Sequence, residues 1–547
     1  MTPVSLSGDL PGKVRDIRWA GTQALLVDLD SLNAVLALHS HLQERPLEGQ
    51  VDVLAAAETV LVVFRSSAAA RAARPVIAAL DVAAPAIGAA SADLVQIEVV
   101  YDGEDLTEVG RLTGLGVDGV IAAHTDQVWT AAFGGFAPGF AYMVGEHDGL
   151  NVPRRSTPRT AVPAGSVALA GNFSAVYPRR SPGGWQLIGR TAARLWDLHR
   201  SPPALLRPGM RVQYLAVREL IETSSAHLNK DDVGGPRGSA FPCSLEVLSP
   251  GPQSLLQDLG RLGLGDLGVS PSGAADLVSA RQANRLVGNE PGDAVVEMVF
   301  GGLAVHTTGE VTAALTGASV SARITGPYGE RSAPMCAGFA LHTGEELHIP
   351  TPDAGLRTYL AVRGGFDVPP VLGSRATDLL SGIGPEPLSS GSVLPVGEVT
   401  RGHVVGEPEP STLPAELVKD DGPVTLRFVR GPRDDWFTFN SLNTLTGQEW
   451  NVTAESNRVG LRLGLPIEDR AGKAQPLERV REGELPSEGV VAGALQVPPS
   501  GLPVLFLADH PVTGGYPVIG VVVPEDLPTA AQLRPGAAVR FAEVDPG

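Results

Sequence analysis

The chain contains VPAGSV from Val162, GGWQLIG from Gly183 and LRPGMRVQYLAV from Leu206, in that order. Similar blocks return later as VPPSGLPV from Val497, GGYPVIG from Gly514 and LRPGAAVRFAEV from Leu533. Chance can repeat one Gly-Gly or Pro-Gly turn in a β protein, but three blocks in one order indicate a duplicated unit. Short apolar runs between Gly and Pro turns are typical of small barrels, so we predict two related β-barrels.

Composition agrees with a β-rich chain of several domains. At 547 residues the chain is too long for one core, and 65 Gly and 46 Pro favour short strands joined by turns. The formal net charge of −18 argues against general binding to nucleic acid or to anionic membranes, because both would repel the protein.

Several kinds of site are disfavoured by residue usage. The four lysines are Lys13, Lys230, Lys419 and Lys473, and none stands in the Gly-rich phosphate loop that Lys completes. Two cysteines without a CxxC pattern suggest neither a disulfide framework nor a metal site, so we expect no protein residues that bind a metal ion. The N-terminus lacks the features of a signal peptide and no apolar run is long enough to span a bilayer, so we expect a cytoplasmic protein.

Changes in residue pattern along the chain suggest its domain boundaries. Strand-like TQALLVDL from Thr22 and LVQIEVV from Leu94 flank two helical stretches, one capped by Ser31 and running to about Glu44 and one from Ala68 to Leu80. We therefore expect an α/β domain over 1–115, a barrel over 116–220, a linker over 221–243 and a second half over 244–547. A weaker joint is expected at Gly402 to Gly422.

A family resemblance rests on long motifs that cover nearly the whole chain. The first half carries His124, GFAPGFAYM from Gly135, PRRSTPR from Pro153, VPAGSVALAG from Val162 and YPRRSPGGWQLIGRT from Tyr177. The second carries GPQSLLQDLGRLG from Gly251, GVSPSGAADLVSARQANRLVGN from Gly268, SNRVGLRL from Ser456, SEGVVAGALQVPPSG from Ser487 and ADHPVTGGYP from Ala508. The chain resembles the B and C subunits of bacterial 5-oxoprolinase, also called allophanate hydrolase subunits 1 and 2 and related to urea amidolyase, fused into one protein.

That resemblance implies a mixed α/β and mostly β fold, with an N-terminal α/β domain followed by cyclophilin-like barrels. It also implies an ATP-dependent cleavage of 5-oxoproline, with Mg as the counter-ion of ATP and with a separate partner, the YcsF-type A subunit. Two rivals stay open. One is a carboxyltransferase-like part of a urea carboxylase, although the chain has no Met-Lys-Met biotin site. The other is a module that inhibits a histidine kinase. Assembly into a homo-oligomer also stays open.

Candidate site residues in the first half come from these motifs. Arg suits a substrate with phosphate or carboxylate groups because its planar fork binds them bidentately. Glycine lets backbone N–H groups approach a ligand closely. The candidates are His124 as a catalytic residue and, for binding, Arg154, Arg159, Ser181, Gly183, Gly184 and Trp185.

In the second half, Asp509 is the preferred general base or magnesium contact, and a turn-forming role is the alternative. Asp258 and Asp276 are further catalytic candidates. A helix is expected with Ser270 as its cap, Pro271 at its first position and Gly288 at its end, which places Asp276 and Asn284 on one broad face. The remaining binding candidates are Gln257, Arg261, Asn284, Arg363, Arg375, Arg458, Glu488, Gln496, Thr513 and Tyr516. Two departures from the family pattern weaken transfer of roles: Phe173-Ser174-Ala175, and the loop GIGPEPLSSGS from Gly382.

Overall fold

A computed structural model describes residues 14–80, 94–220, 243–466 and 474–546, apart from eight residues inside these ranges. Those eight are Ser156, Pro158, Tyr328, Thr400, Asp420, Asp421, Glu482 and Glu484. The expected linker over 221–243 lies outside the described residues except for Cys243. No helix in the parts that are described is long and apolar enough to cross a membrane.

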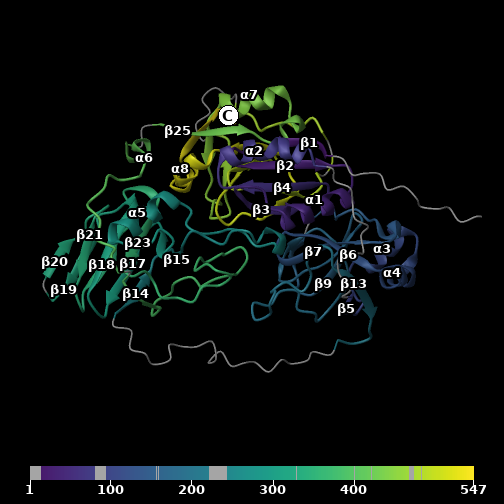
Figure 1. The fold of residues 1–547 in the computed structure, drawn as a ribbon, viewed down its shortest axis with the longest axis horizontal. Helices are drawn as coiled ribbons and strands as arrows, with labels where there is room; N and C mark the ends of the chain where they lie inside the picture. Colours follow the sequence, from purple (N-terminus) through teal and green to yellow (C-terminus); the bar gives the residue numbers. More distant parts are fainter. Residues whose placement is uncertain are drawn as a thin grey trace, which may run out of the picture.

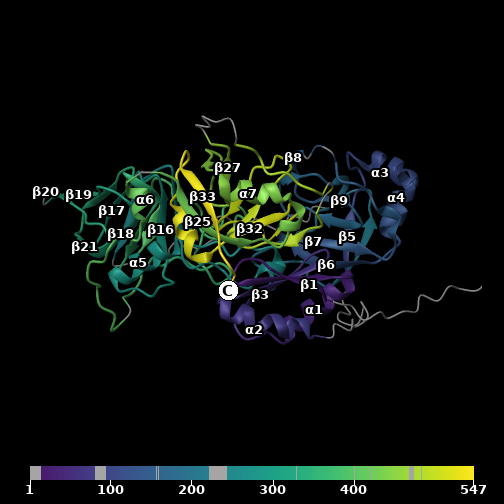
Figure 2. The same cartoon turned by 90° about the horizontal axis from the view of Figure 1, so that it is seen from above.

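Residues 14–80 form an α/β layer with the sheet order β1-β2-β4-β3. Its elements are β1 Val14–Trp19, β2 Ala24–Leu29, α1 Leu32–Glu44, β3 Gln50–Ala55, β4 Thr59–Phe64 and α2 Ser67–Ala78. Ser31 caps α1 as predicted, since its hydroxyl accepts the N–H of Ala34 at 3.3 Å. Both helices cover one face of the sheet, and Figure 2 shows them on its outer side.

The second unit is a seven-stranded sheet with the order β12-β9-β10-β7-β6-β13-β5. Its elements are β5 Leu94–Val99, α3 Leu106–Thr113, α4 Gly116–Thr125, β6 Trp129–Gly135, β7 Ala137–Gly145, β8 Arg159–Val162, β9 Ser166–Ala170, β10 Phe173–Val176, β11 Ser181–Gly183, β12 Gln186–Arg190 and β13 Arg211–Ala216. Because β5 pairs in parallel with β13, residues 94–115 belong to this unit. The division therefore precedes residue 94 and differs from the expected boundary at 115.

Residues 243–396 form two packed sheets, with the orders β20-β19-β22-β17-β14-β24 and β15-β16-β23-β18-β21. A shared apolar core lies between them. The elements are β14 Ser244–Pro250, β15 Gln253–Gln257, α5 Leu277–Val287, β16 Val295–Val299, β17 Leu303–Thr307, β18 Val311–Ser319, β19 Arg323–Gly326, β20 Gly329–Ser332, β21 Gly338–Leu341, β22 Glu346–Ile349, β23 Ala354–Val362 and β24 Val393–Pro395.

The cap of α5 corrects one expectation. Asp276, not Ser270, is the N-cap, and its carboxylate accepts the N–H of Ser279 at 2.9 Å. Ser270 instead donates its hydroxyl to the carbonyl of Ala508 at 3.1 Å, because the preceding loop follows the neighbouring barrel before the helix begins. The end of the helix is as predicted, with Gly288 at a φ of 72°.

A closed barrel completes the chain, with the order β25-β32-β29-β30-β27-β26-β33. Its elements, with the short helix α6 Ala415–Lys419 before it, are β25 Val424–Arg430, α7 Phe439–Gly447, β26 Trp450–Val452, β27 Gly460–Gly464, β28 Glu488–Gly489, β29 Ala494–Gln496, β30 Val504–Phe506, β31 Thr513–Gly514, β32 Val518–Val522, α8 Leu527–Ala531 and β33 Ala538–Glu543. Figure 1 shows this barrel between the two-sheet unit and the first barrel.

Both barrels use the same strand order. Replacing β5, β6, β7, β9, β10, β12 and β13 by β25, β26, β27, β29, β30, β32 and β33 reproduces every strand pair of the first sheet in the second. The last barrel has one further pair, β25–β32, whose counterpart in the first unit is the isolated bridge between Val100 and Arg190. The small ribbon β8–β11 likewise corresponds to β28–β31. In each barrel the first strand runs parallel to the last. The prediction of related barrels is confirmed at the level of topology.

Two of the three repeated blocks occupy equivalent places. GGWQLIG and GGYPVIG join β11 to β12 and β31 to β32, and the LRPG segments precede β13 and β33. The first block does not. VPAGSV precedes β9, whereas VPPSGLPV lies one strand later, between β29 and β30. The segment in the equivalent place is VVAGALQV from Val490, whose Gly493 matches the positive φ of Gly165.

Candidate functional site

A cavity of about 450 Å³ lies where three units meet. The face of the α/β sheet that its helices leave open packs on the last barrel, through Leu26, Leu54 and Leu61 against Val512. The segment around α5 closes the remaining side with Leu259, Ser272 and Leu277. Largely apolar cavities with a few polar groups are the usual form of small-molecule sites.

The cavity has an exposed rim and a buried floor. Leu262 and Val278 line it and are 62% and 46% exposed, and the exposed Arg281 lines it too. Ser272, Ala508 and His510 also line it, and behind them stands the buried Asp509. The α/β layer and α5 add the polar side chains of Thr22, Gln23, Asp52 and Arg281, so a ligand in this mostly apolar cavity would meet polar groups on several sides.

Asp509 is held in a buried ion pair. Arg458 donates from Nε to Oδ2 and from Nη2 to Oδ1, each at 2.9 Å, and Ser272 donates its hydroxyl to Oδ1 at 2.7 Å. Such a bidentate pair has a fixed geometry. Asp509 and Arg458, both predicted site residues, are thus brought together, and Asp509 positions the cavity floor whether or not it also acts as a base.

A second carboxylate shares the same guanidinium. Glu297 accepts Nη1 of Arg458, the hydroxyl of Tyr359 at 2.8 Å and the N–H of Ala275 at 2.8 Å. Burial alone would lower the pKa of Arg458, but Asp509 and Glu297 outweigh it and raise that pKa well above its ordinary value. Burial would likewise raise the pKa of Glu297, but Arg458 and Arg357 hold it low. The charges therefore persist inside the protein.

Ser272 and His510 are site residues that the sequence reasoning missed. Ser272 has a φ of 53°, a left-handed conformation that costs a non-glycine residue roughly 1–2 kcal/mol. His510 is 4% exposed and lies 2.8 Å through Nδ1 from the carbonyl of Pro511. A carbonyl only accepts, so Nδ1 carries the proton; burial lowers the pKa of His510, which leaves Nε2 as an acceptor. In the sequence, the only indication that these two residues belong to the site was their position next to Pro271 and Asp509 in the quoted motifs.

Asp276 joins this network from the helix side. Besides capping α5, it accepts Nε2 of Gln532 at 2.8 Å, and its backbone N–H donates to the hydroxyl of Tyr359 at 2.8 Å. Burial raises the pKa of Asp276. Asn284 points elsewhere, with Nδ2 on the carbonyl of Asp293 at 2.7 Å, so it holds the loop after the helix and does not join Asp276.

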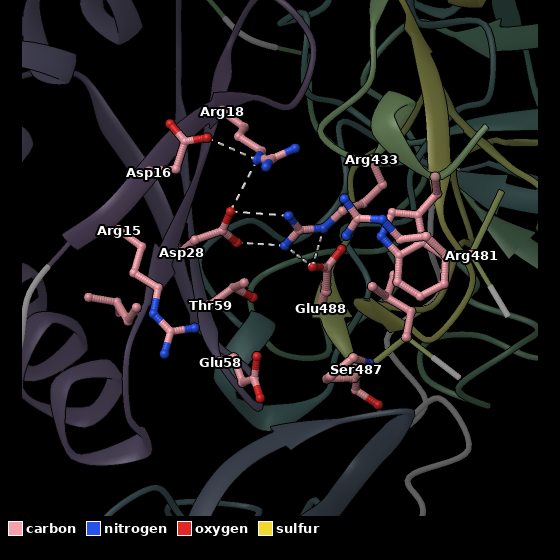
Figure 3. Close-up of a pocket in the computed structure, with 14 residues that line it drawn as sticks. Arg15, Asp16, Arg18, Asp28, Glu58, Thr59, Arg433, Arg481, Ser487 and Glu488 are labelled. Carbon is pink, nitrogen blue, oxygen red and sulfur yellow. Dashed lines mark hydrogen bonds and ion pairs between the residues drawn. The ribbon is translucent and has the colours of Figure 1, made fainter. Parts of the chain in front are cut away.

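A second cavity, of about 330 Å³, separates the α/β layer from the last barrel (Figure 3). Arg433 crosses it to Asp28, with Nη2 to Oδ1 at 2.6 Å, and also binds Glu488 through Nε at 2.6 Å. Arg18 bonds the same Asp28 at 3.1 Å. Glu488, a predicted ligand contact, is thus part of the ion-pair network that joins the two units.

His124 lies inside the first barrel and is fully buried. Its Nδ1 is 2.7 Å from the hydroxyl of Tyr101, its Nε2 is 2.9 Å from that of Ser174, and its ring stacks on Tyr214 at 4.1 Å. Burial lowers the pKa of His124 to about 3, so the ring is neutral. The unusual Ser174 therefore completes a core network, and the structure places His124 away from both cavities.

The other first-half candidates have structural contacts within the first barrel. Arg159 binds Asp105 at 2.9 Å, and Gly184 accepts the N–H of Arg155 at 2.8 Å. Gly183 is needed because a Cβ there would lie 2.3 Å from the Tyr177 hydroxyl. Trp185 packs on Phe140 and Tyr142 at 5.6 and 5.5 Å. The Ser181 hydroxyl is buried and has no hydrogen-bond partner among the described residues.

Tyr142 marks where the two barrels meet. Burial raises its pKa, and Ser487, Arg154 and Thr513 oppose that shift. A Cβ added to Gly515 would lie 3.9 Å from Nη1 of Arg154, so Arg154 of the first barrel reaches the segment that follows Thr513. Thr513 also accepts the N–H of Phe136 at 3.1 Å. Arg154 and Thr513 therefore share a position at the interface between the barrels and not a place in a cavity.

The remaining second-half candidates hold loops. Asp258 accepts the hydroxyl of Ser374 and the N–H of Arg375, both at 2.6 Å. Arg363 donates to the carbonyl of His403 at 2.6 Å, and Gln496 to that of Tyr516 at 3.1 Å. Tyr516 is 45% exposed. Gln257 and Arg261 differ from these because each leaves buried polar atoms without a partner in the described structure.

Comparison with known proteins gives the family. Residues 15–206 match subdomains C and D of the carboxyltransferase domain, and residues 267–543 match subdomains A and B. The chain belongs to the carboxyltransferase-domain family. It is homologous to the B and C subunits of 5-oxoprolinase and to the carboxyltransferase region of urea amidolyase.

Individual relatives cover different parts. The chain is 33% identical to the C subunit of Escherichia coli 5-oxoprolinase over 304 residues, which is 55% of this chain and 91% of that protein. It is 43% identical to the B subunit of Bacillus subtilis 5-oxoprolinase over 129 residues, 23% of this chain and 54% of that protein. Urea amidolyase of Lachancea kluyveri is 32% identical over 322 residues, 55% of this chain but 17% of that protein.

One solved structure is similar over nearly the whole chain. The crystal structure of TTHA0988 covers 96% of this chain and 100% of its own, with 32% identity and a TM-score of 0.78. The mixed α/β and mostly β class, the N-terminal α/β layer and the barrels are therefore confirmed.

Proposed function

We propose that this chain is the fused B and C part of an ATP-dependent 5-oxoprolinase, which opens 5-oxo-L-proline to L-glutamate. One observation carries the proposal: relatives that are B subunits and relatives that are C subunits match successive parts of one chain. The contact between the halves supports it, because the 450 Å³ cavity needs the α/β layer of the first half and the barrel of the second. Neither half alone would enclose it.

Opening a lactam means breaking a resonance-stabilised amide. ATP would supply an activated amide oxygen, and the chain would have to orient the ring and exclude bulk water. The cavity offers apolar walls for a small ring, and its floor offers two acceptors, the hydroxyl oxygen of Ser272, whose proton goes to Asp509, and the neutral ring nitrogen of His510. His510 is suited to accept a proton from a nucleophile because Nε2 is its unprotonated nitrogen.

Neither of the two cavities is suited to a triphosphate. The smaller one is lined by Arg15, Arg18, Arg433 and Arg481, but Asp16, Asp28, Glu58 and Glu488 line it too, so its charges balance. The larger is mostly apolar. We propose that a separate protein of the YcsF type, in the cytoplasm, supplies most nucleotide contacts.

Reconstitution tests this function. The purified chain, mixed with a YcsF-type protein from the same genome, should release glutamate and ADP in equal amounts from 5-oxoproline, and either protein alone should release little. A strain lacking the gene should fail to grow on 5-oxoproline as sole nitrogen source and recover with a plasmid copy. Normal growth of the deletion strain would overturn the proposal.

The family name favours a second candidate, a carboxyltransferase step of a urea carboxylase, and the urea amidolyase match supports it. That step needs a biotin carrier, and this sequence contains no Met-Lys-Met segment. Urea-dependent consumption of carboxybiotin by the chain, without turnover of 5-oxoproline, would favour this candidate.

A further inference from the structure

A third cavity, of about 180 Å³, lies between the two-sheet unit and the last barrel. It shares no lining residue with the two larger cavities. One wall is a face of the sheet that contains β15, β16 and β23, and the other wall consists of two loops of the barrel. Nothing in the proposed function uses this cavity.

Strand register places Arg357 on the sheet wall. Gln253 of β15 pairs with Val299 of β16, and Val299 pairs with Arg357 of β23. Directly paired residues project from the same face of a sheet, so these three side chains form one row. All three line the cavity, and Arg357 is only 2% exposed. The sheet therefore presents a buried guanidinium to the space below the barrel.

The barrel wall adds polar groups from the segment between β26 and β27. Ser456, Asn457 and Arg458 line the cavity, and the exposed Asn457 lies at its rim. Oδ1 of Asn457 accepts the N–H of Val459 at 2.8 Å, and Nδ2 has no partner among the described residues. Each polar side chain of the lining can donate a hydrogen bond, and none of the lining residues carries a carboxylate. The cavity is therefore suited to a ligand that accepts hydrogen bonds.

Arg357 has unused donors. Its Nη1 donates to the carbonyl of Ala531, but Nε is buried and has no hydrogen-bond partner in the described structure, and Nη2 donates to no described group either. Its counter-ion is Glu297, yet Nε and Oε1 are 3.5 Å apart, and the same oxygen already accepts Nη1 of Arg458. Leaving a buried charged donor unsatisfied is unfavourable, so an acceptor placed beside Nε and Nη2 would be stabilising.

The carboxylates of this region stand behind the cavity. Glu297 and Asp509 balance the charges of Arg357 and Arg458, and neither of them lines the cavity. Burial raises the pKa of the nearby Asp276, which favours its neutral form. An anion in the cavity would therefore meet guanidinium groups before it meets a carboxylate.

A third guanidinium adds positive charge nearby. Arg534 stands between Leu533 and Pro535, which both line the cavity. It donates to the carbonyls of Gly355 and Pro352 and forms no ion pair in the part of the chain that is described. Since neutral carbonyls leave its charge uncompensated, Arg534 favours an anion in this region.

We propose that the 180 Å³ cavity binds a small oxyanion, of which inorganic phosphate and sulfate are the simplest examples. Nε and Nη2 of Arg357 bind two of its oxygens, because a guanidinium binds such groups through a planar fork. The amide groups of Gln253 and Asn457 supply further donors. Sites for drug-sized ligands usually exceed about 300 Å³, so a cavity of this size favours an anion over a whole nucleotide.

The oxyanion site is separate from the 450 Å³ cavity but joined to it by one side chain. Arg458 lines the small cavity, while its Nε and Nη2 hold Asp509 behind the floor of the large one. Occupancy of the small cavity would therefore act on the floor of the large cavity through Arg458. The inference goes beyond the proposed function and does not depend on which substrate the large cavity takes.

Calorimetry with the purified full-length chain, in a buffer whose only small anion is chloride, tests the ligand class. We expect inorganic phosphate and sulfate to bind saturably at one site per chain. Methyl phosphate represents an esterified source, and tighter binding than phosphate would assign the site to phosphate esters. Absence of saturable binding of all three anions would overturn the inference. Displacement of phosphate by 5-oxoproline, one for one, would also overturn it, because the site would then not be separate.

Asn457→Asp tests the rim. The variant keeps Oδ1 as the acceptor for the N–H of Val459 and replaces the unpaired amide N–H₂ by a negatively charged oxygen. Affinity for phosphate should fall about tenfold or more, because an acceptor and a charge of the wrong sign replace a donor. Asn440→Asp, at an exposed position of α7, adds the same charge and should stay within about twofold of the original affinity. Equal losses in both variants would show only general repulsion and would contradict the site.

Arg357→Lys tests the fork. Lys keeps a positive charge for Glu297 but cannot bind an oxyanion bidentately, so phosphate affinity should again fall about tenfold or more. The melting temperature without phosphate shows whether the variant is folded, and if it is not, Asn457→Asp still decides. Phosphate and sulfate stabilise many proteins by exclusion from the surface, so thermal shifts are compared between variants. An equal shift for the original chain and for Asn457→Asp would argue against a specific site.

Discussion

Arg458 and Asp509, 51 residues apart in sequence, form two hydrogen bonds of 2.9 Å in a fully buried ion pair. The same guanidinium also bonds the carbonyl of Gly273 at 2.6 Å. One side chain of the last barrel therefore fixes the loop that forms the cavity floor. The site depends on contact between the two-sheet unit and the barrel.

Replacing Arg458 by Met should destabilise the protein strongly. The change leaves the carboxylates of Asp509 and Glu297 buried without their counter-charge, and breaking a buried pair from one side typically costs about 3–5 kcal/mol. Urea unfolding followed by fluorescence measures the loss. Arg462→Met is the control, because Arg462 is 56% exposed and its contact with Glu455 is 3.8 Å long. A loss equal to that of the control would contradict the role of the pair.

Asp509→Asn tests catalysis. If Asp509 acts as the general base, coupled turnover in the reconstituted complex should fall by about 10² to 10⁴, the usual size of such contributions. The melting temperature must be measured beside the rate, because Asn also weakens the bond to Arg458. A stable variant with unchanged turnover would leave Asp509 with the structural role described above.

Stability should depend on pH through Asp52. Burial raises its pKa from 3.8 to about 6, and Asp266 adds to the shift. A carboxyl with a raised pKa destabilises the fold when ionised, so the penalty is full above pH 6, shrinks as the pH falls and is absent below 3.8. Asp52→Asn should therefore raise the melting temperature at pH 8 and less at pH 5, while retaining an acceptor for the N–H of Gly265 at 3.2 Å. A gain in melting temperature that is equal at both pH values would contradict the assignment. The absence of any gain, which is the result expected for the exposed control Asp367→Asn, would contradict it too.

Brief proteolysis should cut first within 221–242, because that segment has little apolar periodicity and many Ser, Asp and Gly residues. The two fragments should remain associated on a sizing column. Their contact includes Leu61 against Val512 and the Arg433 bridge to Asp28. Separate elution of the fragments would argue against a permanent interface.

The duplication extends to a side-chain detail. Trp129 and Trp450 each donate their indole N–H to the carbonyl five residues earlier, of His124 at 3.0 Å and of Leu445 at 3.1 Å. Losing that bond leaves a buried carbonyl unpaired, so Trp129→Phe and Trp450→Phe should each cost about 1–3 kcal/mol in urea unfolding. A negligible cost for either variant would show that its indole bond contributes little.

The sequence by itself determined the repeated barrels, the strands at Ala24–Leu29 and Leu94–Val99, and the helix capped by Ser31. These follow from short-range patterns: apolar periodicity, capping residues and Gly or Pro turns. It also supplied Asp509 and Arg458 as candidate site residues, although without their pairing. Where two turn-rich blocks were compared by composition alone, VPAGSV was matched to a segment one strand too late.

Only the tertiary structure decided which of these residues share a site. It placed His124 in a closed core, moved the helix cap from Ser270 to Asp276, and laid the open face of the α/β sheet on the other half's barrel. Such partners are tens to hundreds of residues apart, and their meeting depends on how whole sheets pack. A local pattern carries no information about that packing, because the same polar residue can cap a helix, fill a core or face a cavity.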